Sequence, residues 1–299
     1  MSIRIPSGLP AGEILKREGF TVLNDLVNPL EIAILNLMPV KQETELQLLR
    51  AIGNTSLNLN ITFLRMASHI SKNTGAEHLA AFYNVHEEVK HKRFDGLIIT
   101  GAPIETIAFE EVGYWKELCE IMAWSLDSAR SVLHICWGAQ AALYYHYGIS
   151  KYPLAKKMFG IFPHTKTKES VKYDILKGFD DVFNVPQSRH TEIRKADIDK
   201  STNLVVLSES EQAGLYMAAS ADGRRQIFVT GHLEYDSLTL KKEYERDIAR
   251  GDTIDIPQNY FPGDDASKPP TVTWRAHANL FFSNWLKYCV QAGDDANFN

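Results

Sequence analysis

One cysteine of this chain stands between an expected strand and an expected helix. Residues 131–135, Ser-Val-Leu-His-Ile, are mostly apolar, and the small residues Gly138 and Ala139 follow Cys136 almost at once. This pattern predicts a strand–nucleophile–helix elbow, in which a sharp turn lifts the cysteine above the sheet and points the helix N-terminus at it. The positive end of that helix favours thiolate over thiol. The alternative is an inert cysteine buried in a strand, the commoner fate of a free cysteine.

A cysteine nucleophile needs a base and a group that orients the base. His232 and Glu234 directly follow the expected strand 226–230. In a parallel sheet the active crevice lies beyond the carboxyl ends of the strands, where both Cys136 and His232 are expected. Glu234 can then fix the imidazole tautomer, which predicts a Cys136–His232–Glu234 triad. The alternative for this pair is a turn histidine beside a solvated carboxylate.

Two backbone N–H groups near the elbow are candidates for holding an oxyanion. Ala102 lies in the sequence Gly-Ala-Pro just after the expected strand 96–100, and Trp137 directly follows the cysteine. Donors at such positions can stabilise the negative charge that develops during acyl transfer. For Ala102 the alternative is an ordinary Gly-Pro turn.

The elements that must position these residues alternate along the chain. The expected strands, each a short apolar run, are 31–37, 57–64, 96–100, 131–135, 204–207, 215–217 and 226–230. The expected helices are 11–18, 44–52, 110–125, 237–249 (with Asp236 as its N-cap) and 274–290. This order predicts an α/β fold with a mostly parallel sheet flanked by helices. Residues 147–194 give a less regular pattern, rich in Lys, His and Pro.

The size of the chain allows one large domain or two small ones. We expect one domain over residues 1–299, with an N-terminal arm, 1–28, and a long surface loop, 251–272. Loops of this length in compact domains are often functional.

The composition excludes several classes of protein. The chain has 299 residues, 44% of them hydrophobic and 23% charged, and a net charge of −5, which is typical of a soluble protein and unlike a nucleic-acid-binding one. No apolar run approaches the roughly 20 residues that span a bilayer. The first residues lack a signal-peptide core, so a cytoplasmic location is expected. Three cysteines indicate reduced thiols rather than disulfides, and no metal site is expected.

Six motifs along the chain together resemble one family. They are 36–41 (Asn-Leu-Met-Pro-Val-Lys), 100–103 (Thr-Gly-Ala-Pro), 135–141 (Ile-Cys-Trp-Gly-Ala-Gln-Ala), 186–189 (Pro-Gln-Ser-Arg), 231–236 (Gly-His-Leu-Glu-Tyr-Asp) and 274–279 (Trp-Arg-Ala-His-Ala-Asn). This set is similar to the homoserine O-acyltransferases of the homoserine transsuccinylase type, from about residue 5 to residue 288. The resemblance implies a single acyltransferase domain with a class I glutamine-amidotransferase-like fold. It also implies acyl transfer from an acyl-CoA to an amino-acid hydroxyl through an acyl-cysteine.

The resemblance also assigns roles to residues. It makes Cys136 the nucleophile, His232 the general base and Glu234 its partner. The positions that match substrate contacts of the family are Lys157, Ser188 and Arg246, with Lys41 as a further pocket position. Glu243 lies three residues before Arg246 on one helix face, so that Arg246 can clamp the carboxylate of an amino acid and Glu243 its ammonium. Without the resemblance, this pair reads as a surface ion pair, and Lys41 as a solvated lysine.

Glu105 stands at the position that separates the acyl donors of the family. Users of acetyl-CoA resemble one another in having Glu there, and users of succinyl-CoA in having Gly. A carboxylate side chain crowds and repels the distal carboxylate of succinate. Acetyl-CoA is therefore the expected co-substrate, and no bound cofactor is expected.

The expected function is acetyl transfer from acetyl-CoA to L-homoserine, in methionine biosynthesis. The chain departs from the family pattern at two places. Leu233 stands where the family commonly has Pro, and the segment 21–29 is shorter than usual; both departures concern the choice of acceptor. L-Serine, the acceptor in cysteine biosynthesis, stays open because one methylene is worth only about 1–3 kcal/mol of discrimination. A succinyl donor, a glutaminase-type hydrolase and a binding module with an idle thiol are further alternatives. The expected partners are small-molecule substrates, without nucleic acid or membrane, and the resemblance suggests a homodimer.

Overall fold

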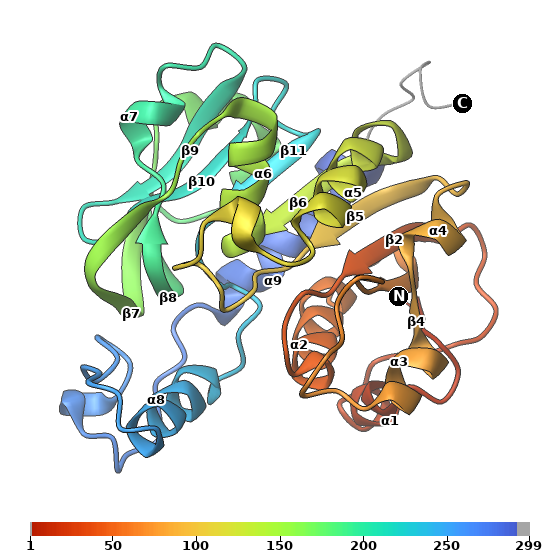
Figure 1. Ribbon diagram of the computed structural model, residues 1–299, viewed down its shortest axis with the longest axis horizontal. Helices are drawn as coiled ribbons and strands as arrows, with labels where there is room; N and C mark the ends of the chain where they lie inside the picture. Colours follow the sequence, from red (N-terminus) through yellow and green to blue (C-terminus); the bar gives the residue numbers. More distant parts are fainter. Residues whose placement is uncertain (1, 292–299) are drawn as a thin grey trace.

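A single eleven-stranded sheet runs through the molecule, which the computed structural model describes over residues 2–291 (Figure 1). The strand order is β1-β3-β2-β5-β6-β11-β10-β9-β7-β8, with the short β4 paired to β3. The strands are β1 (Ser2–Arg4), β2 (Leu30–Leu35), β3 (Asn58–Leu64), β4 (Tyr83–Asn84), β5 (Phe94–Ile99), β6 (Ala129–Ile135), β7 (Tyr152–Lys166), β8 (Val182–Glu192), β9 (Leu204–Ser210), β10 (Gly214–Ser220) and β11 (Gln226–Val229).

The sheet has a parallel part and an antiparallel part. All pairings from β1 to β11 are parallel, whereas β10, β9, β7 and β8 continue the sheet by antiparallel pairings. The predicted α/β class with a mostly parallel, helix-flanked sheet is confirmed. The less regular stretch 147–194 contains the two longest strands, β7 and β8, which form the outer hairpin of the antiparallel part.

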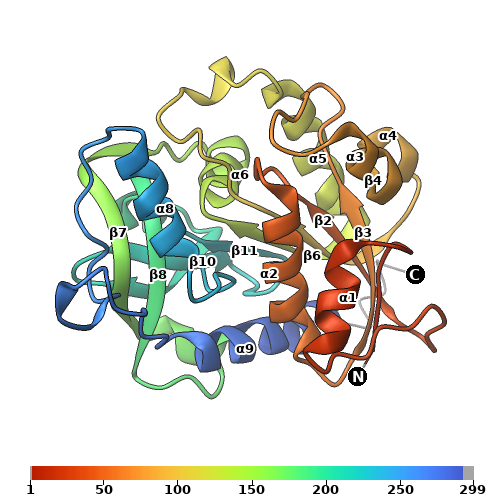
Figure 2. The same cartoon turned by 90° about the horizontal axis from the view of Figure 1, so that it is seen from below.

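Helices cover both faces of the parallel part (Figures 1 and 2). The α-helices are α1 (Pro10–Arg17), α2 (Lys41–Gly53), α3 (Ala76–Phe82), α4 (His86–Val89), α5 (Trp115–Ser128), α6 (Trp137–Tyr147), α7 (Lys195–Ile198), α8 (Thr239–Ala249) and α9 (Arg275–Asn284). Short helices of other types are η1 (Phe109–Glu111), η2 (Glu169–Lys172), η3 (Asp174–Leu176), η4 (Pro262–Asp264) and the π-helix η5 (Trp285–Gln291).

Two hydrophobic cores lie on opposite sides of the sheet because successive strand residues point to opposite faces. On β2, Ile32 and Ile34 pack into the core that includes residues of α1, α2 and α9. Ala33 and Leu35 pack into the other core, with residues of α5 and α6. Burial on both faces explains why β2 reads as a continuous apolar run.

The N-terminal arm, 1–28, and the loop 251–272 both contact this sheet. In the first 28 residues, β1 pairs in parallel with β3, and Leu15 of α1 is fully buried. Within 251–272, Gln258 bridges to β7: its N–H donates to the carbonyl of Phe159 at 3.0 Å, and its carbonyl accepts from Ile161 at 2.8 Å. The loop therefore lies beside the middle of β7.

Several details differ from the sequence-based expectation, among them the later start of the helix expected over 110–125, which is α5. Asp236 does not cap α8, which begins at Thr239 after Leu238; instead its carboxylate accepts a hydrogen bond from Arg50 at 2.6 Å. The expected helix 274–290 consists of α9 followed by the π-helix η5. Within residues 2–291, none of the helices combines the length and the apolar character that crossing a bilayer requires.

Candidate active site

The expected elbow is present at Cys136, which separates β6 from α6. Its backbone has φ 52° and ψ −116°, a conformation that non-glycine residues adopt rarely and at a cost. The Cys136 N–H donates to the carbonyl of Val229 in β11 at 2.7 Å, and its carbonyl accepts from Gln140 in α6 at 3.1 Å. These bonds hold the strained turn from both sides.

Gly138 allows α6 to begin close to the end of β5. A Cβ at this position would lie 2.6 Å from the carbonyl oxygen of Thr100 and 2.8 Å from that of Ile99, closer than real Cβ contacts. Trp137 is the first residue of α6, so its N–H is one of the donors that have no acceptor within the helix. Gly101 lies beside it, since a Cβ there would be 3.6 Å from the Trp137 nitrogen and 3.1 Å from the Cys136 Cβ.

The structure brings His232 to the elbow by strand pairing. β6 and β11 are parallel neighbours, with Ile135 opposite Val229, so the residues that follow them leave the sheet side by side. His232 donates its N–H to the carbonyl of Pro186 in β8 at 2.9 Å. Its Nδ1 donates to Glu234 Oε1 at 2.6 Å, and both side chains are buried.

The electrostatic surroundings favour the protonated form of His232. Burial by itself lowers the pKa of His232, but the negative charges of Glu234 and Cys136, and the hydrogen bonds to both, raise this pKa well above its ordinary value. Because Nδ1 is bonded to Glu234, the contact with the sulfur falls to Nε2. The arrangement suits an imidazolium in contact with the sulfur of Cys136.

Cys136 and His232 open into a cavity of about 990 Å³. Of the site residues predicted from the sequence, the cavity is lined by Ala102, Glu105, Cys136, Lys157, Ser188, His232, Glu243 and Arg246. Glu234 and Trp137 lie behind this surface, next to His232 and Cys136 respectively. Side chains from remote parts of the chain therefore converge on one hollow.

A polar network crosses the cavity from β7 and β8 to α8. Ser188 Oγ donates to Glu243 Oε2 at 2.5 Å, and Lys157 Nζ lies 3.4 Å from the same oxygen. Lys157 also pairs with Asp247 at 3.2 Å, and Arg246 Nε donates to Asp247 at 2.7 Å. The bonds from Arg246 and Lys157 outweigh the effect of burial and lower the pKa of Asp247. The cavity thus presents the carboxylates of Glu243 and Asp247 together with the cationic groups of Lys157 and Arg246.

Glu105 is held rigidly at the cavity wall. Its side chain is buried, and Oε1 accepts a hydrogen bond from the backbone N–H of His190 in β8 at 2.7 Å. A fixed carboxylate at this place both fills space and contributes negative charge.

Lys41 does not line the cavity. Its buried ammonium donates to the carbonyl oxygens of Asn36 and Met38, the latter at 3.2 Å, and lies 5.7 Å from the centre of the Tyr83 ring. Burial lowers the pKa of Lys41 to about 8. Met38 and Pro39 do line the cavity, so Lys41 supports this wall from behind.

Two residues in or beside the site were not predicted from the sequence. Tyr235 stacks on His232, with ring centres 4.1 Å apart and planes inclined by 13°. Arg189 is fully buried and donates to Gln187 Oε1 at 3.2 Å and to the carbonyls of Thr191, at 2.8 Å, and Ala213. Tyr235 lies in the motif 231–236 and Arg189 in the motif 186–189. Membership of these motifs was the one sequence signal for either residue, and their spacing indicated no role.

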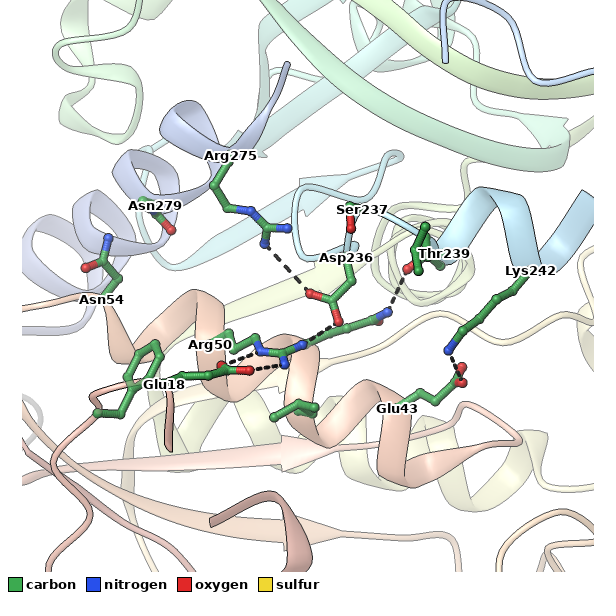
Figure 3. A pocket seen from close by; sticks show the side chains of 14 residues that line it. Glu18, Glu43, Arg50, Asn54, Asp236, Ser237, Thr239, Lys242, Arg275 and Asn279 are labelled. Atoms are coloured by element: carbon green, nitrogen blue, oxygen red, sulfur yellow. Dashed lines mark hydrogen bonds and ion pairs between the residues drawn. The ribbon is translucent and has the colours of Figure 1, made fainter. Parts of the chain in front are cut away.

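A second hollow of about 690 Å³ lies between α2 and the start of α8 (Figure 3). It contains none of the predicted site residues. Arg50 joins Glu18 to Asp236, Lys242 pairs with Glu43 at 2.8 Å, and Arg275 points to Asp236 from α9. Asp236 ends the turn that begins at His232, so these ion pairs anchor that turn to α2 and α9.

The fold is that of the class I glutamine amidotransferases. The structure superimposes on a glutamine amidotransferase from Thermotoga maritima with a TM-score of 0.56 (12% identity, 88% of this chain and 99% of that chain). For a glutamine amidotransferase from Methylobacillus flagellatus the TM-score is 0.52 (14% identity, 90% of this chain and 98% of that chain). Similarity at these identities speaks for the fold alone.

A profile of the homoserine O-succinyltransferase family matches residues 2–295, and the chain belongs to this family. Among its relatives is a homoserine O-acetyltransferase of Brevibacillus brevis, 56% identical over 97% of this chain and 96% of that protein. A second homoserine O-acetyltransferase, from Acetivibrio thermocellus, is 57% identical over the same shares.

Proposed function

We propose that the protein transfers an acetyl group from acetyl-CoA to the hydroxyl of L-homoserine, a step of methionine biosynthesis, through an acetyl-cysteine at Cys136. The observation that carries the proposal is the strained Cys136 elbow, which shares one cavity with the His232–Glu234 pair. The relatives named homoserine O-acetyltransferase support this substrate pair, since they match nearly the whole chain at 53–57% identity. Reduced cysteine chemistry of this kind fits a cytoplasmic location.

In the first half-reaction, the Cys136 thiolate attacks the thioester carbonyl carbon of acetyl-CoA. The carbonyl oxygen becomes an oxyanion, and we assign its stabilisation to the backbone N–H groups of Trp137 and Ala102. When the intermediate collapses, the bond from carbon to the CoA sulfur breaks. The CoA thiolate takes the proton of the His232 imidazolium, and the acetyl group stays on Cys136.

In the second half-reaction, His232 acts as the general base. The ring is neutral at this stage because its proton has left with CoA, and acetylation has removed the negative charge of the sulfur, one of the causes of the raised pKa of His232. The acceptor hydroxyl gives its proton to His232 while its oxygen attacks the acetyl carbon. Collapse releases the Cys136 thiolate and O-acetyl-L-homoserine, and the thiolate–imidazolium pair is restored. Glu234 holds the ring in one tautomer throughout.

The network on α8 suits a zwitterionic acceptor. Glu243 offers a carboxylate for the ammonium group, with Ser188 and Lys157 fixing its orientation. Arg246 offers a planar guanidinium for the carboxylate, and about half of its side chain is exposed. Glu105 sets the acyl donor, because its carboxylate at the wall disfavours a second carboxylate on the acyl group.

Steady-state kinetics with matched substrates test the proposal. We expect turnover with acetyl-CoA and L-homoserine, a lower kcat/KM with L-serine or succinyl-CoA, and no release of ammonia from L-glutamine. Cys136→Ala abolishes turnover if the proposal holds. Glutamine hydrolysis without acetyl transfer, or unchanged turnover of Cys136→Ala, would overturn it.

A further inference from the structure

Tyr235 joins the catalytic base to the carboxylate of the acceptor site. Its ring lies almost parallel to the imidazole of His232, with ring centres 4.1 Å apart and an angle of 13°. Its hydroxyl donates to Glu243 Oε1 at 3.1 Å, the oxygen that neither Ser188 nor Lys157 uses. One rigid side chain therefore contacts both halves of the site.

The position of Tyr235 is fixed independently of these two contacts. The indole Nε1 of the buried Trp274, at the start of α9, donates to the Tyr235 carbonyl at 3.0 Å. The Tyr235 N–H donates to the carbonyl of His232 at 3.3 Å, which closes the turn. The ring stack is therefore a consequence of the backbone fold and does not depend on a bound ligand.

The hydroxyl of Tyr235 remains a proton donor. Burial, followed by the charges of Glu243, Glu234 and Cys136, raises the pKa of Tyr235 well above its ordinary value. The ring is thus a neutral phenol with an electron-rich face turned to an imidazolium. A cation over the face of such a ring is stabilised by the ring quadrupole, most strongly where water is excluded.

We propose that Tyr235 is a positioning residue with two separable actions: its ring stabilises the protonated form of His232, and its hydroxyl orients Glu243 for the acceptor ammonium. The inference rests on the proposed function and adds a link between the two half-reactions. The charged groups that act directly on the two rings are Glu234, Cys136 and Glu243. Tyr216, Arg189 and Lys157, from the neighbouring strands, face Glu234, Cys136 and Glu243 respectively.

Two substitutions separate the actions. Tyr235→Phe keeps the ring and removes the hydroxyl, whereas Tyr235→Leu removes both. The effect of the ring is measured by the pH midpoint of His232, which requires no acyl transfer. NMR of histidine-labelled protein follows this titration, and the His232→Gln variant assigns the signal. We expect Tyr235→Leu to lower the midpoint by about one pH unit and Tyr235→Phe to leave it in place.

The effect of the Tyr235 hydroxyl is measured by the KM for the acceptor. We expect Tyr235→Phe to raise the KM for L-homoserine by about tenfold, the effect of losing one hydrogen bond to a charged group, and to leave the KM for acetyl-CoA unchanged. The matched control is Tyr173→Phe, which removes another tyrosine hydroxyl, one that donates to the carbonyl of Ala221 at 3.1 Å on a residue that does not line the cavity. It should alter neither readout.

The outcomes distinguish this inference from the proposed function. A wild-type protein without acetyl transfer contradicts the proposed function, while the NMR titration still decides the action of the ring. An active wild type in which Tyr235→Leu leaves the His232 midpoint unchanged overturns the ring action. An unchanged KM for L-homoserine in Tyr235→Phe overturns the hydroxyl action.

Discussion

At the residue scale, the site depends on groups that are held in unfavourable states by their neighbours. Cys136 keeps a positive φ because bonds to β11 and α6 fix its peptide groups. His232 is buried at the cavity, yet its pKa is raised by Glu234 and Cys136. Such departures from the relaxed state concentrate at functional sites, where surrounding structure enforces them.

Glu105 gives a prediction at this scale. Glu105→Gly removes both the bulk and the charge at the wall, so we expect kcat/KM with succinyl-CoA to rise at least about tenfold, or about 1.4 kcal/mol of transition-state binding. The kinetics are measured with succinyl-CoA and acetyl-CoA in parallel.

Glu105→Gln is the matched control because it keeps the size and can still accept from the His190 N–H. A gain with Gly and none with Gln assigns the selectivity to crowding, and equal gains assign it to charge. Donor preference that stays unchanged in both variants contradicts the role of Glu105.

At the element scale, the site results from the close approach of β5, β6, β11 and the start of α6. Gly138→Ala would place a Cβ 2.6 Å from a carbonyl oxygen at the end of β5. We expect the free energy of unfolding to fall by about 1–3 kcal/mol and turnover to fall, since α6 must move and Trp137 N–H moves with it. Denaturant unfolding and kinetics on the same samples measure both effects.

The control for this substitution is Gly113→Ala, where nothing lies within 4 Å of the added Cβ. It should stay within about 0.5 kcal/mol of wild type, as surface substitutions usually do. A Gly138→Ala protein with the stability and the turnover of wild type would show that the approach is less tight than described.

The same scale shows which parts of the fold the sequence could predict. Strand 131–135 and the turn at His232 were predictable because buried parallel strands are plain apolar runs and their ends share one edge. β7 and β8 were not, since Tyr152–Lys166 carries lysines and prolines with no clean alternation. Pairing with a hairpin partner, and not local pattern, makes this segment a strand.

The contents of the site were predictable only in part. Residues whose chemistry is visible in the side chain, such as Cys136 and Glu243, were found. Tyr235 and Arg189 were missed because their importance comes from a ring stack and from burial, which exist only after folding. Lys41 was expected at the pocket, but the fold turns its side chain to backbone carbonyls behind the wall.

At the scale of the whole molecule, the two parts of the sheet supply different residues of the proposed active site. The parallel part supplies the nucleophile and the base, and the antiparallel hairpin of β7 and β8 supplies Lys157, Ser188 and a buried polar layer beneath them. His164 belongs to that layer, where Nδ1 donates to the Phe162 carbonyl at 2.9 Å. Burial, assisted by the charge of Arg189, lowers the pKa of His164 to about 4.

A pH dependence of stability follows from His164. The unfolded chain binds a proton at this histidine near pH 6.5 and the native state only near pH 4, so stability is full above 6.5 and is lost as the pH falls. Between pH 6.5 and pH 4, protonation of His164 in the unfolded chain lowers the free energy of unfolding by about 1.4 kcal/mol for each unit by which the pH falls.

His164→Gln removes this titration, so its stability should fall less steeply between pH 6.5 and 4.5 than that of the wild type. Urea unfolding at several pH values measures the slopes, and substitution of the exposed His91 by Gln serves as the control. Parallel slopes for wild type and His164→Gln would contradict the buried, neutral state of His164.

The central claim is that acetyl transfer passes through Cys136, and mass spectrometry of the acetyl-enzyme tests it most directly. Protein mixed with acetyl-CoA and no acceptor should gain the mass of one acetyl group on the peptide that contains Cys136. Addition of L-homoserine should remove this group and yield O-acetyl-L-homoserine. Product formation at the normal rate while Cys136 stays unmodified in the absence of acceptor, or an acetyl group on another residue that is passed to L-homoserine, would contradict the account.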